Sequence, residues 1–146
     1  MKRFIRAVSL FMVVVMLLAT PAYAAETGES RASSYFMCSS VYLYKTSALT
    51  FQAWFDVTGI HGMEEIGART IKIQRSEDGE SWIDVKIFSR ADYPQMICEN
   101  TVCHASYVTY TGTPGYYYRA YIVLYAKDSN GSGEWYRYTS PIQLIV

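Results

Sequence analysis

The feature that most constrains the fold of this chain is an alternation of apolar and polar residues with a period of two. It is clearest between residues 49 and 57 and again between residues 116 and 127. Successive side chains of a β-strand point to opposite faces of a sheet, so this period predicts strands that bury one face. The stretch after residue 34 does not show the 3.6-residue period of an amphipathic helix.

Seven strands are predicted, separated by segments rich in Gly, Pro, Asn and Asp. Pro94 lies in one break, and the glycine-bracketed segment GIHGMEEIG at residues 59–67 is predicted to be a loop. This pattern is typical of a single antiparallel β-sandwich of the fibronectin type III or immunoglobulin-like kind. Tyr116 or Tyr118 would then form its tyrosine corner. The predicted strands are residues 41–44, 49–57, 69–75, 83–87, 106–111, 116–127 and 135–146.

The segment QRSEDGESW at residues 74–82 is similar to the Asp-box turns of sialidase-type propellers. In an Asp-box the glycine stands two residues after the aspartate, whereas Asp78 and Gly79 are adjacent and the segment occurs once. Asp-Gly between two alternating apolar stretches is a strong hairpin signal, because glycine adopts positive φ without steric cost. The segment therefore predicts a hairpin between the third and fourth strands.

The first residues have the pattern of a secretory signal peptide. A basic start precedes an apolar stretch at residues 8–19, and Ala22-Tyr23-Ala24 supplies the cleavage pattern. We expect a signal peptide at residues 1–24, a flexible tail at 25–34 and one β-sandwich domain at 35–146. The mature chain would have 10 basic and 13 acidic residues. We therefore expect a secreted, extracellular protein that binds no nucleic acid and has no stable membrane insertion after cleavage.

Three cysteines, Cys38, Cys98 and Cys103, follow the predicted cleavage site. An exported protein is exposed to oxidising conditions, so one pair is expected to form a disulfide. Cys98 and Cys103 would close a local loop, whereas a bond from Cys38 to either would restrict a longer segment. The spacing leaves the pairing open. The odd cysteine would be available for a disulfide-linked dimer.

The composition is unusual in its 14 tyrosines, several of which fall on the sixth predicted strand. Alternation places Tyr117, Arg119, Tyr121 and Tyr125 on the face opposite the core, and Trp135 or Tyr138 of the last strand could extend this row. An exposed aromatic row can stack on sugar rings or anchor a protein partner. The alternative interpretation is cross-strand pairing that only stabilises the sheet, with Arg119 over a ring.

Catalytic and metal-binding interpretations have weak support in the sequence. His61 lies near Glu64 and Glu65, and His104 follows Cys103, but neither group has a recurring ligand spacing. Acidic residues at positions 77, 78 and 80 could act as a glycosidase pair, although acidic residues in turns are usually only solvated. No catalytic residue, metal or cofactor is therefore predicted.

Most of the chain resembles a family of small secreted proteins of unknown function from Gram-positive bacteria. The resemblance rests on residues 31–33 (RAS), on IKIQ at 71–74 running into SEDG, and on VTYTG at 108–112 before Gly115-Tyr116. The stretch at 114–133 is also similar to the closing strands of fibronectin type III domains. The resemblance implies a fold and a compartment, and it supplies no catalytic residues.

Together these features predict a secreted, non-catalytic β-sandwich that binds a protein or glycan at the cell envelope or in the medium. Two alternatives of different kinds stay open. The chain could be an antimicrobial or toxin-like effector, or, with less support, a small secreted hydrolase that uses its acidic loops.

Overall fold

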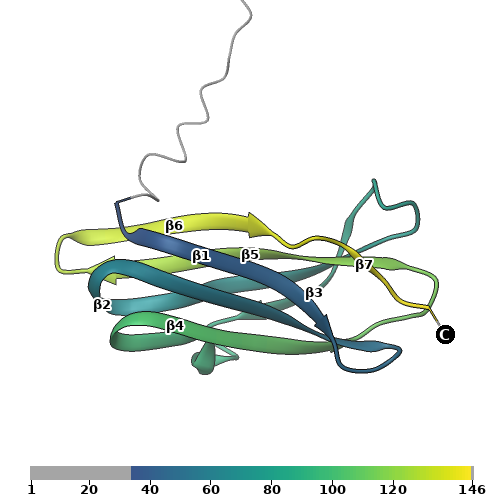
Figure 1. Cartoon of the computed structure of the whole chain (residues 1–146), viewed down its shortest axis with the longest axis horizontal. Coiled ribbons are helices and arrows are strands. Elements are labelled where there is room, and N and C mark those ends of the chain that lie inside the picture. Colours follow the sequence, from purple (N-terminus) through teal and green to yellow (C-terminus); the bar gives the residue numbers. More distant parts are fainter. Residues whose placement is uncertain (1–33, 146) are drawn as a thin grey trace, which may run out of the picture.

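The computed structural model describes residues 34–145, which form seven antiparallel strands and one short 3₁₀ helix (Figure 1). The predicted signal peptide at 1–24, most of the predicted tail and the RAS motif at 31–33 lie outside the described residues. Within residues 34–145, no helix is long and apolar enough to cross a membrane. The elements are β1 (Phe36–Lys45), β2 (Thr50–Ser76), β3 (Ile83–Ser89), η1 (Pro94–Met96), β4 (Ile97–Thr111), β5 (Tyr117–Asp128), β6 (Gly131–Tyr138) and β7 (Ile142–Gln143).

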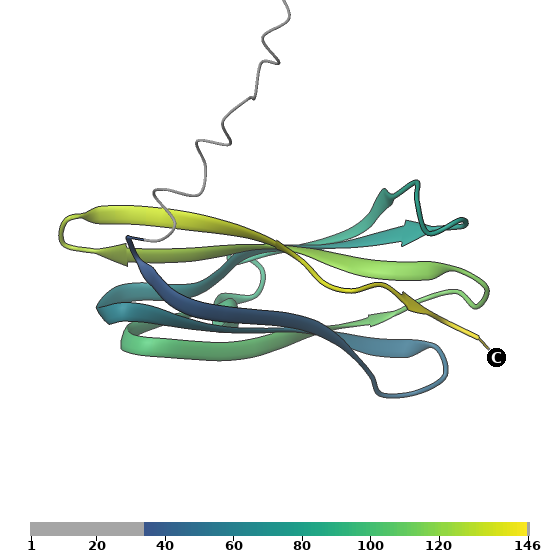
Figure 2. The same cartoon turned by 45° about the horizontal axis from the view of Figure 1, so that its top comes forward.

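The long strand β2 organises the sheet, because four other strands pair with it. Its first half lies between β1 and β4, and its second half lies between β3 and β5. Strands β6 and β7 then pair with β5. Figure 2 shows the result as two layers, with β1 and β4 in one and β3, β5 and β6 in the other. Strand β2 passes from the first layer to the second.

The prediction of a loop at residues 59–67 was wrong, because β2 continues through this segment. Residues Met63–Gly67 pair with β4 on one side, and Glu65–Gly67 pair with β5 on the other. These ladders satisfy the backbone groups that a loop would leave to water. Met63 and Ile66 are also buried, which anchors the segment in the core. A register shift between Thr58 and Met63 marks where the strand changes its pairing.

Several other predicted strands have different bounds in the structure. The first, at 41–44, extends from Phe36 to Lys45 as β1, and those at 49–57 and 69–75 are both parts of β2. The fifth predicted strand, at 106–111, begins earlier and becomes β4, whose first residues follow β2 around its bend. The last predicted strand, at 135–146, is interrupted after Tyr138 and divides into β6 and the short β7. Pro141 lies at this interruption, where no ladder hydrogen bond is lost. The predicted break at Pro94 is confirmed, because η1 begins there.

The core lies between the two layers and is formed by the inward-facing side chains, which belong to every second residue along a strand. The alternation predicted for β5 is confirmed, with Tyr118, Ala120, Ile122 and Leu124 fully buried. Burial of apolar surface of this kind is the main favourable contribution to folding. Outside β5, the largest fully buried side chains are Phe51, Phe55, Val57, Met63, Ile66, Ile71, Ile73, Met96 and Leu144.

Tyr118 closes the connection between β4 and β5. The backbone N–H of Thr113 donates a hydrogen bond of 2.8 Å to the Tyr118 hydroxyl, while the ring packs 5.4 Å from Phe51. This arrangement fits the predicted tyrosine corner, with Tyr118 rather than Tyr116 in the role. The aromatic ring lies in the core, and its polar end bonds the chain that enters the strand.

Tyr118→Phe is expected to lower the free energy of unfolding by about 1–2 kcal/mol, because it leaves the Thr113 N–H without its partner. Denaturant unfolding of the purified chain measures this change. Tyr110→Phe is the matched control, since Tyr110 packs 5.9 Å from Tyr118 and its hydroxyl makes no hydrogen bond within residues 34–145. Equal losses in the two variants would contradict the proposed role of the Tyr118 hydroxyl.

Candidate functional site

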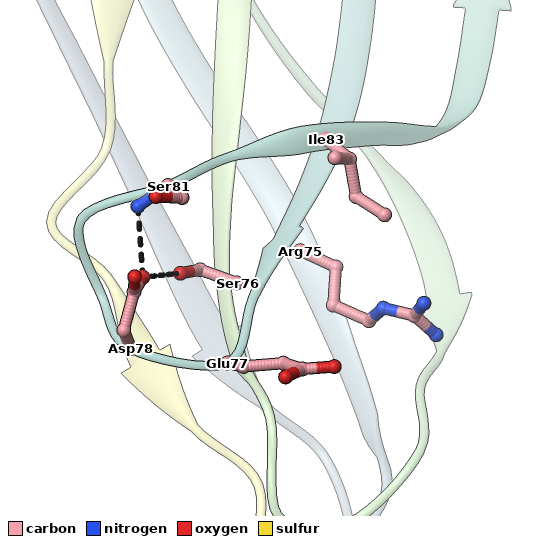
Figure 3. A pocket seen from close by; sticks show the side chains of 6 residues that line it. All are labelled: Arg75, Ser76, Glu77, Asp78, Ser81 and Ile83. Atoms are coloured by element: carbon pink, nitrogen blue, oxygen red, sulfur yellow. Dashed lines mark hydrogen bonds between the residues drawn. The ribbon is translucent and has the colours of Figure 1, made fainter.

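The hairpin between β2 and β3 is held by the side chain of Asp78 (Figure 3). Its Oδ1 accepts hydrogen bonds from the Ser76 hydroxyl at 2.7 Å and from the backbone N–H groups of Glu80 and Ser81, both at 2.8 Å. Gly79 has φ +80°, as the predicted hairpin requires. The segment that resembled an Asp-box is therefore a hairpin turn with a self-contained hydrogen-bond network.

An open cavity of about 220 Å³ lies beside this hairpin and is lined by Arg75, Ser76, Glu77, Asp78, Ser81 and Ile83. The backbone N–H groups of Ser81 and Glu80 hold the pKa of Asp78 well below the ordinary range for aspartate. A general acid needs the opposite shift, since it must be protonated near the working pH. The lowered pKa of Asp78 is therefore the opposite of the raised carboxyl pKa that glycoside hydrolysis uses.

We expect an NMR titration to place the pKa of the Asp78 carboxyl far below the value of about 3.9 for an unstructured aspartate. Because the native pKa is the lower one, the ionised carboxylate stabilises the fold above about pH 4, and this contribution falls as the pH drops toward the native pKa. Asp78→Asn should remove that part of the pH dependence of stability. A carboxyl that titrates near pH 4 would contradict the network in the hairpin.

The predicted aromatic row on β5 lies on the outer surface of its layer. The structure brings Arg119 and Tyr121 together with Trp82, Tyr136 and Tyr138, and we call these five residues the β5–β6 face. They come from three segments, because Trp82 precedes β3 while Tyr136 and Tyr138 belong to β6. Antiparallel pairing of β5 with β6 places Tyr138 directly opposite Tyr121.

Arg119 lies between two aromatic rings of this face. The centre of its guanidinium is 4.3 Å from the Trp82 ring centroid and 4.5 Å from that of Tyr138. Its Nε also donates a hydrogen bond of 2.8 Å to Gln74. Stacking of a cation on a ring face is electrostatically favourable, so Arg119 links the hairpin to β6.

The tyrosines of the β5–β6 face form a cluster around Tyr121. Its ring centroid is 4.7 Å from that of Tyr138 and 6.2 Å from that of Tyr136, with the second pair nearly parallel. Burial raises the pKa of the Tyr121 hydroxyl. Tyr136 and Tyr138 are 54% and 55% exposed, whereas Tyr121 is half-buried between them. The cluster therefore presents two accessible rings on a packed base.

A polar network borders the face on the side of β3. The side-chain oxygen of Gln74 accepts the hydrogen bond from Arg119, and its side-chain nitrogen donates a hydrogen bond of 2.7 Å to Asp84. Asp84 also accepts a hydrogen bond of 3.0 Å from Lys72. The hydrogen bond from Gln74 and the ammonium group of Lys72 lower the pKa of the Asp84 carboxyl. These contacts fix the position of Arg119 relative to three neighbouring strands.

The other two tyrosines of the predicted row, Tyr117 and Tyr125, are not among the five residues of the β5–β6 face. Tyr125 lies four residues along β5 from Tyr121, beneath the guanidinium groups of Arg69 and Arg90 at 5.6 and 5.9 Å. Tyr117 lies at the other end of β5 and pairs with Ser76 beside the hairpin. Both side chains are half-buried. They mark the two ends of the strand rather than the centre of the face.

Trp135, predicted to extend the row, lies on the opposite side of β6. It pairs with the buried Leu124, and its ring packs 5.7 Å from that of Phe36. The neighbouring residue Tyr136 takes the outward position instead. The alternation in the sequence predicts Tyr138 as an extension of the row, but it does not identify Tyr136 or Trp82. Both residues could have been found from the sequence. Tyr136 stands two residues before Tyr138 and therefore faces the same side of the strand, and Trp82 is next to the predicted hairpin.

The predicted disulfide is not formed, since Cys38, Cys98 and Cys103 are all free thiols in the structure. Cys38 and Cys103 pair with the same residue, Thr58, from opposite sides of β2. Two strand spacings separate their Cα atoms by roughly 10 Å, which is more than a disulfide can span. Cys98 lies elsewhere, opposite Ile66. A link from Cys38 or Cys103 to a second molecule stays a prediction.

The histidines do not gather the neighbours that the sequence suggested. His61 lies 3.2 Å from Asp128 instead of Glu64 and Glu65, which pair with Lys127 and Arg90. The His104 ring lies 2.8 Å from the Gln95 carbonyl oxygen and packs against Phe55. Residues 34–145 contain no group of three or more His, Cys, Asp or Glu side chains that could hold a metal ion.

Comparison with known proteins adds no assignment to this geometry. The chain matches no family model and no curated protein.

Proposed function

We propose that this chain is a secreted, non-catalytic β-sandwich of the fibronectin type III kind that binds an extracellular protein through the β5–β6 face. The fold proposal is supported by the strand pairing. Strands β1 and β4 pair with the first half of β2, and strands β3 and β5 pair with its second half. Strand β6 pairs with β5. The Tyr118 hydrogen bond at the β4–β5 connection supports the same fold.

The observation that carries the binding proposal is the composition of the β5–β6 face. It combines one tryptophan, three tyrosines and one arginine in mutual contact. Tryptophan, tyrosine and arginine are the residues enriched at the energetic centres of protein interfaces. The rings are rigid amphipathic anchors, and Arg119 is already ordered by stacking, so little side-chain entropy would be lost on binding. This composition favours a protein over a glycan as the partner.

The carboxylates of the acidic loops support the non-catalytic part of the proposal. Asp78 is ionised by its hairpin network, Glu64 lies 3.4 Å from Lys127, and Glu65 lies 2.6 Å from Arg90. The hairpin network favours the charged form of Asp78, and the other two carboxylates lie in ion pairs. A retaining or inverting glycosidase needs one carboxyl that stays protonated.

The binding proposal is tested by affinity enrichment from the culture medium and from cell-envelope extracts of the producing organism. Immobilised mature chain is compared with Tyr136→Ala/Tyr138→Ala, whose two residues are more than half exposed and so are expected to tolerate replacement. We expect one discrete protein to be retained by the unmodified chain and lost with the double variant. Ile60→Ala, at an exposed position in the bend of β2 and outside the β5–β6 face, is the control that should retain it. Equal retention by the double variant would contradict the proposal.

A further inference from the structure

The layer opposite the β5–β6 face carries a second aromatic row. Tyr42 of β1 pairs with Trp54 of β2, and Trp54 pairs with Tyr107 of β4. Residues directly opposite each other in neighbouring strands point to the same side of a sheet. The three rings therefore form a continuous row across three strands, and we call it the Trp54 ladder.

The rings of the Trp54 ladder pack against one another. The centroids of Tyr42 and Trp54 are 6.2 Å apart with an angle of 2° between their planes. Those of Trp54 and Tyr107 are 4.4 Å apart and tilted by 33°. Tyr42 is 46% exposed and Tyr107 is 41% exposed, so the outer rings are accessible at both ends.

The surroundings of the ladder are polar but almost without charge. The relevant stretch runs from Cys38 to Tyr44 on β1 and includes the residues of β2 and β4 that pair across from it. Among its outward-facing side chains, Asp56 is the one that carries a charge. By contrast, the β5–β6 face contains the charged Arg119, and the polar network beside it contains Lys72 and Asp84. The outward residues around the ladder are Cys38, Ser40, Tyr44, Gln52, Asp56, Thr58, Cys103, Ala105 and Thr109.

Trp54 is held in place by its neighbour along the strand. Its indole Nε1–H donates a hydrogen bond of 2.9 Å to the Gln52 side-chain oxygen. Gln52 and Asp56 stand two residues before and two residues after Trp54 on β2, so their side chains share its face of the sheet. An amide and a carboxylate beside a fixed ring are suitable partners for the hydroxyl groups of a stacked sugar.

We propose that the Trp54 ladder is a glycan-binding site for an extended β-1,4-linked chain of neutral pyranoses. Apolar faces of the sugar rings would stack on the exposed parts of Tyr42 and Tyr107, which Trp54 supports from between them, while hydroxyl groups bond to Gln52 and Asp56. The row crosses three strands, so its outer Cα positions span roughly 10 Å. This length accommodates a short run of sugar rings lying across the strands.

Three observations favour a glycan over a protein on this surface. The rings lie in one row on a sheet, the near absence of charge suits an uncharged ligand, and the bordering residues include hydroxyl groups and the Gln52 amide. A ribbon-shaped glycan presents alternating apolar faces and hydroxyl edges that match this pattern. The site is separate from the β5–β6 face, so either proposal can fail without the other.

Isothermal titration calorimetry with cellohexaose and chitohexaose tests the site directly. We expect the unmodified chain to bind at least one of them, and Trp54→Ala to weaken that binding by about tenfold or more, as loss of a stacking ring implies. Trp54→Phe should recover part of the affinity because it retains a ring. The Trp54 indole N–H resonance should shift during an NMR titration of the unmodified chain.

Tyr42→Ala/Tyr107→Ala provides a second variant at exposed positions, in case Trp54→Ala fails to fold. It should weaken the same binding by a similar factor. Ile60→Ala, at an exposed position in the bend of β2, is the control and should bind as the unmodified chain does. Failure of both hexasaccharides to bind the folded chain overturns the proposal. Binding that is unchanged in the ladder variants overturns it as well.

Discussion

Gly67→Ala is expected to lower the free energy of unfolding by about 3 kcal/mol or more. A β-carbon at this position would lie 2.0 Å from the Met96 carbonyl oxygen and 3.0 Å from the Ile97 Cα. Both are backbone atoms and cannot move aside as a flexible side chain does. Gly67 also has φ +153°, a conformation that alanine rarely adopts. Close approach of β4 to the bend of β2 thus depends on this glycine.

Gly62→Ala is the matched control for this variant. Gly62 lies in the same bend, and a β-carbon there would meet nothing within 4 Å. Its replacement is expected to change stability by less than about 1 kcal/mol. Denaturant unfolding at one pH measures both variants. Similar stabilities for Gly67→Ala and Gly62→Ala would contradict the packing of Met96 against β2.

Arg119→Ala is expected to lower the free energy of unfolding by about 2–3 kcal/mol. The variant removes the guanidinium between Trp82 and Tyr138 and the hydrogen bond to Gln74. The hairpin should then lose its contact with β6, and the Trp82 indole N–H resonance should move toward the value of an exposed tryptophan. Arg119→Lys should recover only part of the loss, because an ammonium group cannot stack as a planar group does.

Arg137→Ala is the control for the Arg119 variant. Arg137 also lies over an aromatic ring, that of Trp135 at 4.8 Å, but it contacts one ring only. The expected loss is below about 1 kcal/mol. Calorimetric or denaturant unfolding compares the two variants under the same conditions. An Arg137→Ala variant as unstable as Arg119→Ala would show that stacking between two rings has no special role.

The strands could be predicted because their alternation reflects local burial, and most of them were found near their observed positions. The buried parity of β5 followed directly from Tyr118, Ala120, Ile122 and Leu124. The hairpin at Asp78-Gly79 was also predicted, since its signal lies in two adjacent residues. These features depend on short-range sequence, where period and turn chemistry act together.

The continuity of β2 could not be predicted from the residues alone. Gly59, Gly62 and Gly67 are typical of loops, and the segment between them has no clean alternation. It is a strand because β4 and β5 supply its hydrogen bonds from 30 or more residues away in the chain. Pairing of this kind is decided by tertiary structure. Local propensity pointed in the other direction.

The candidate site shows the same division. Arg119 and Tyr121 were placed correctly on the outer face, because the parity of β5 was clear. Residues 134–138 of β6 carry aromatic side chains on both parities, so alternation could not decide whether Trp135 or Tyr136 points outward. Pairing of Trp135 with the buried Leu124 decides it. Trp82 joined the face only through its contact with Arg119, which no sequence period encodes.

The disulfide prediction is not confirmed, for a related reason. Spacing along the chain left three pairings open, and the strand order removes the bond between Cys38 and Cys103. Thr58 lies between them, so they are on alternate strands rather than neighbouring ones. Strand order was the missing information, and it also creates the Trp54 ladder on the same surface.

Site-specific photo-crosslinking tests the central claim, protein binding by the β5–β6 face, most directly. A photoreactive phenylalanine analogue replaces Tyr138 in one chain and the exposed Ile60 in another, and each is exposed to culture medium and envelope extract of the producing organism. We predict one discrete protein adduct from position 138, identified by mass spectrometry, and none from position 60. An identical adduct pattern from both positions, or no adduct from position 138, would contradict the assignment of this face.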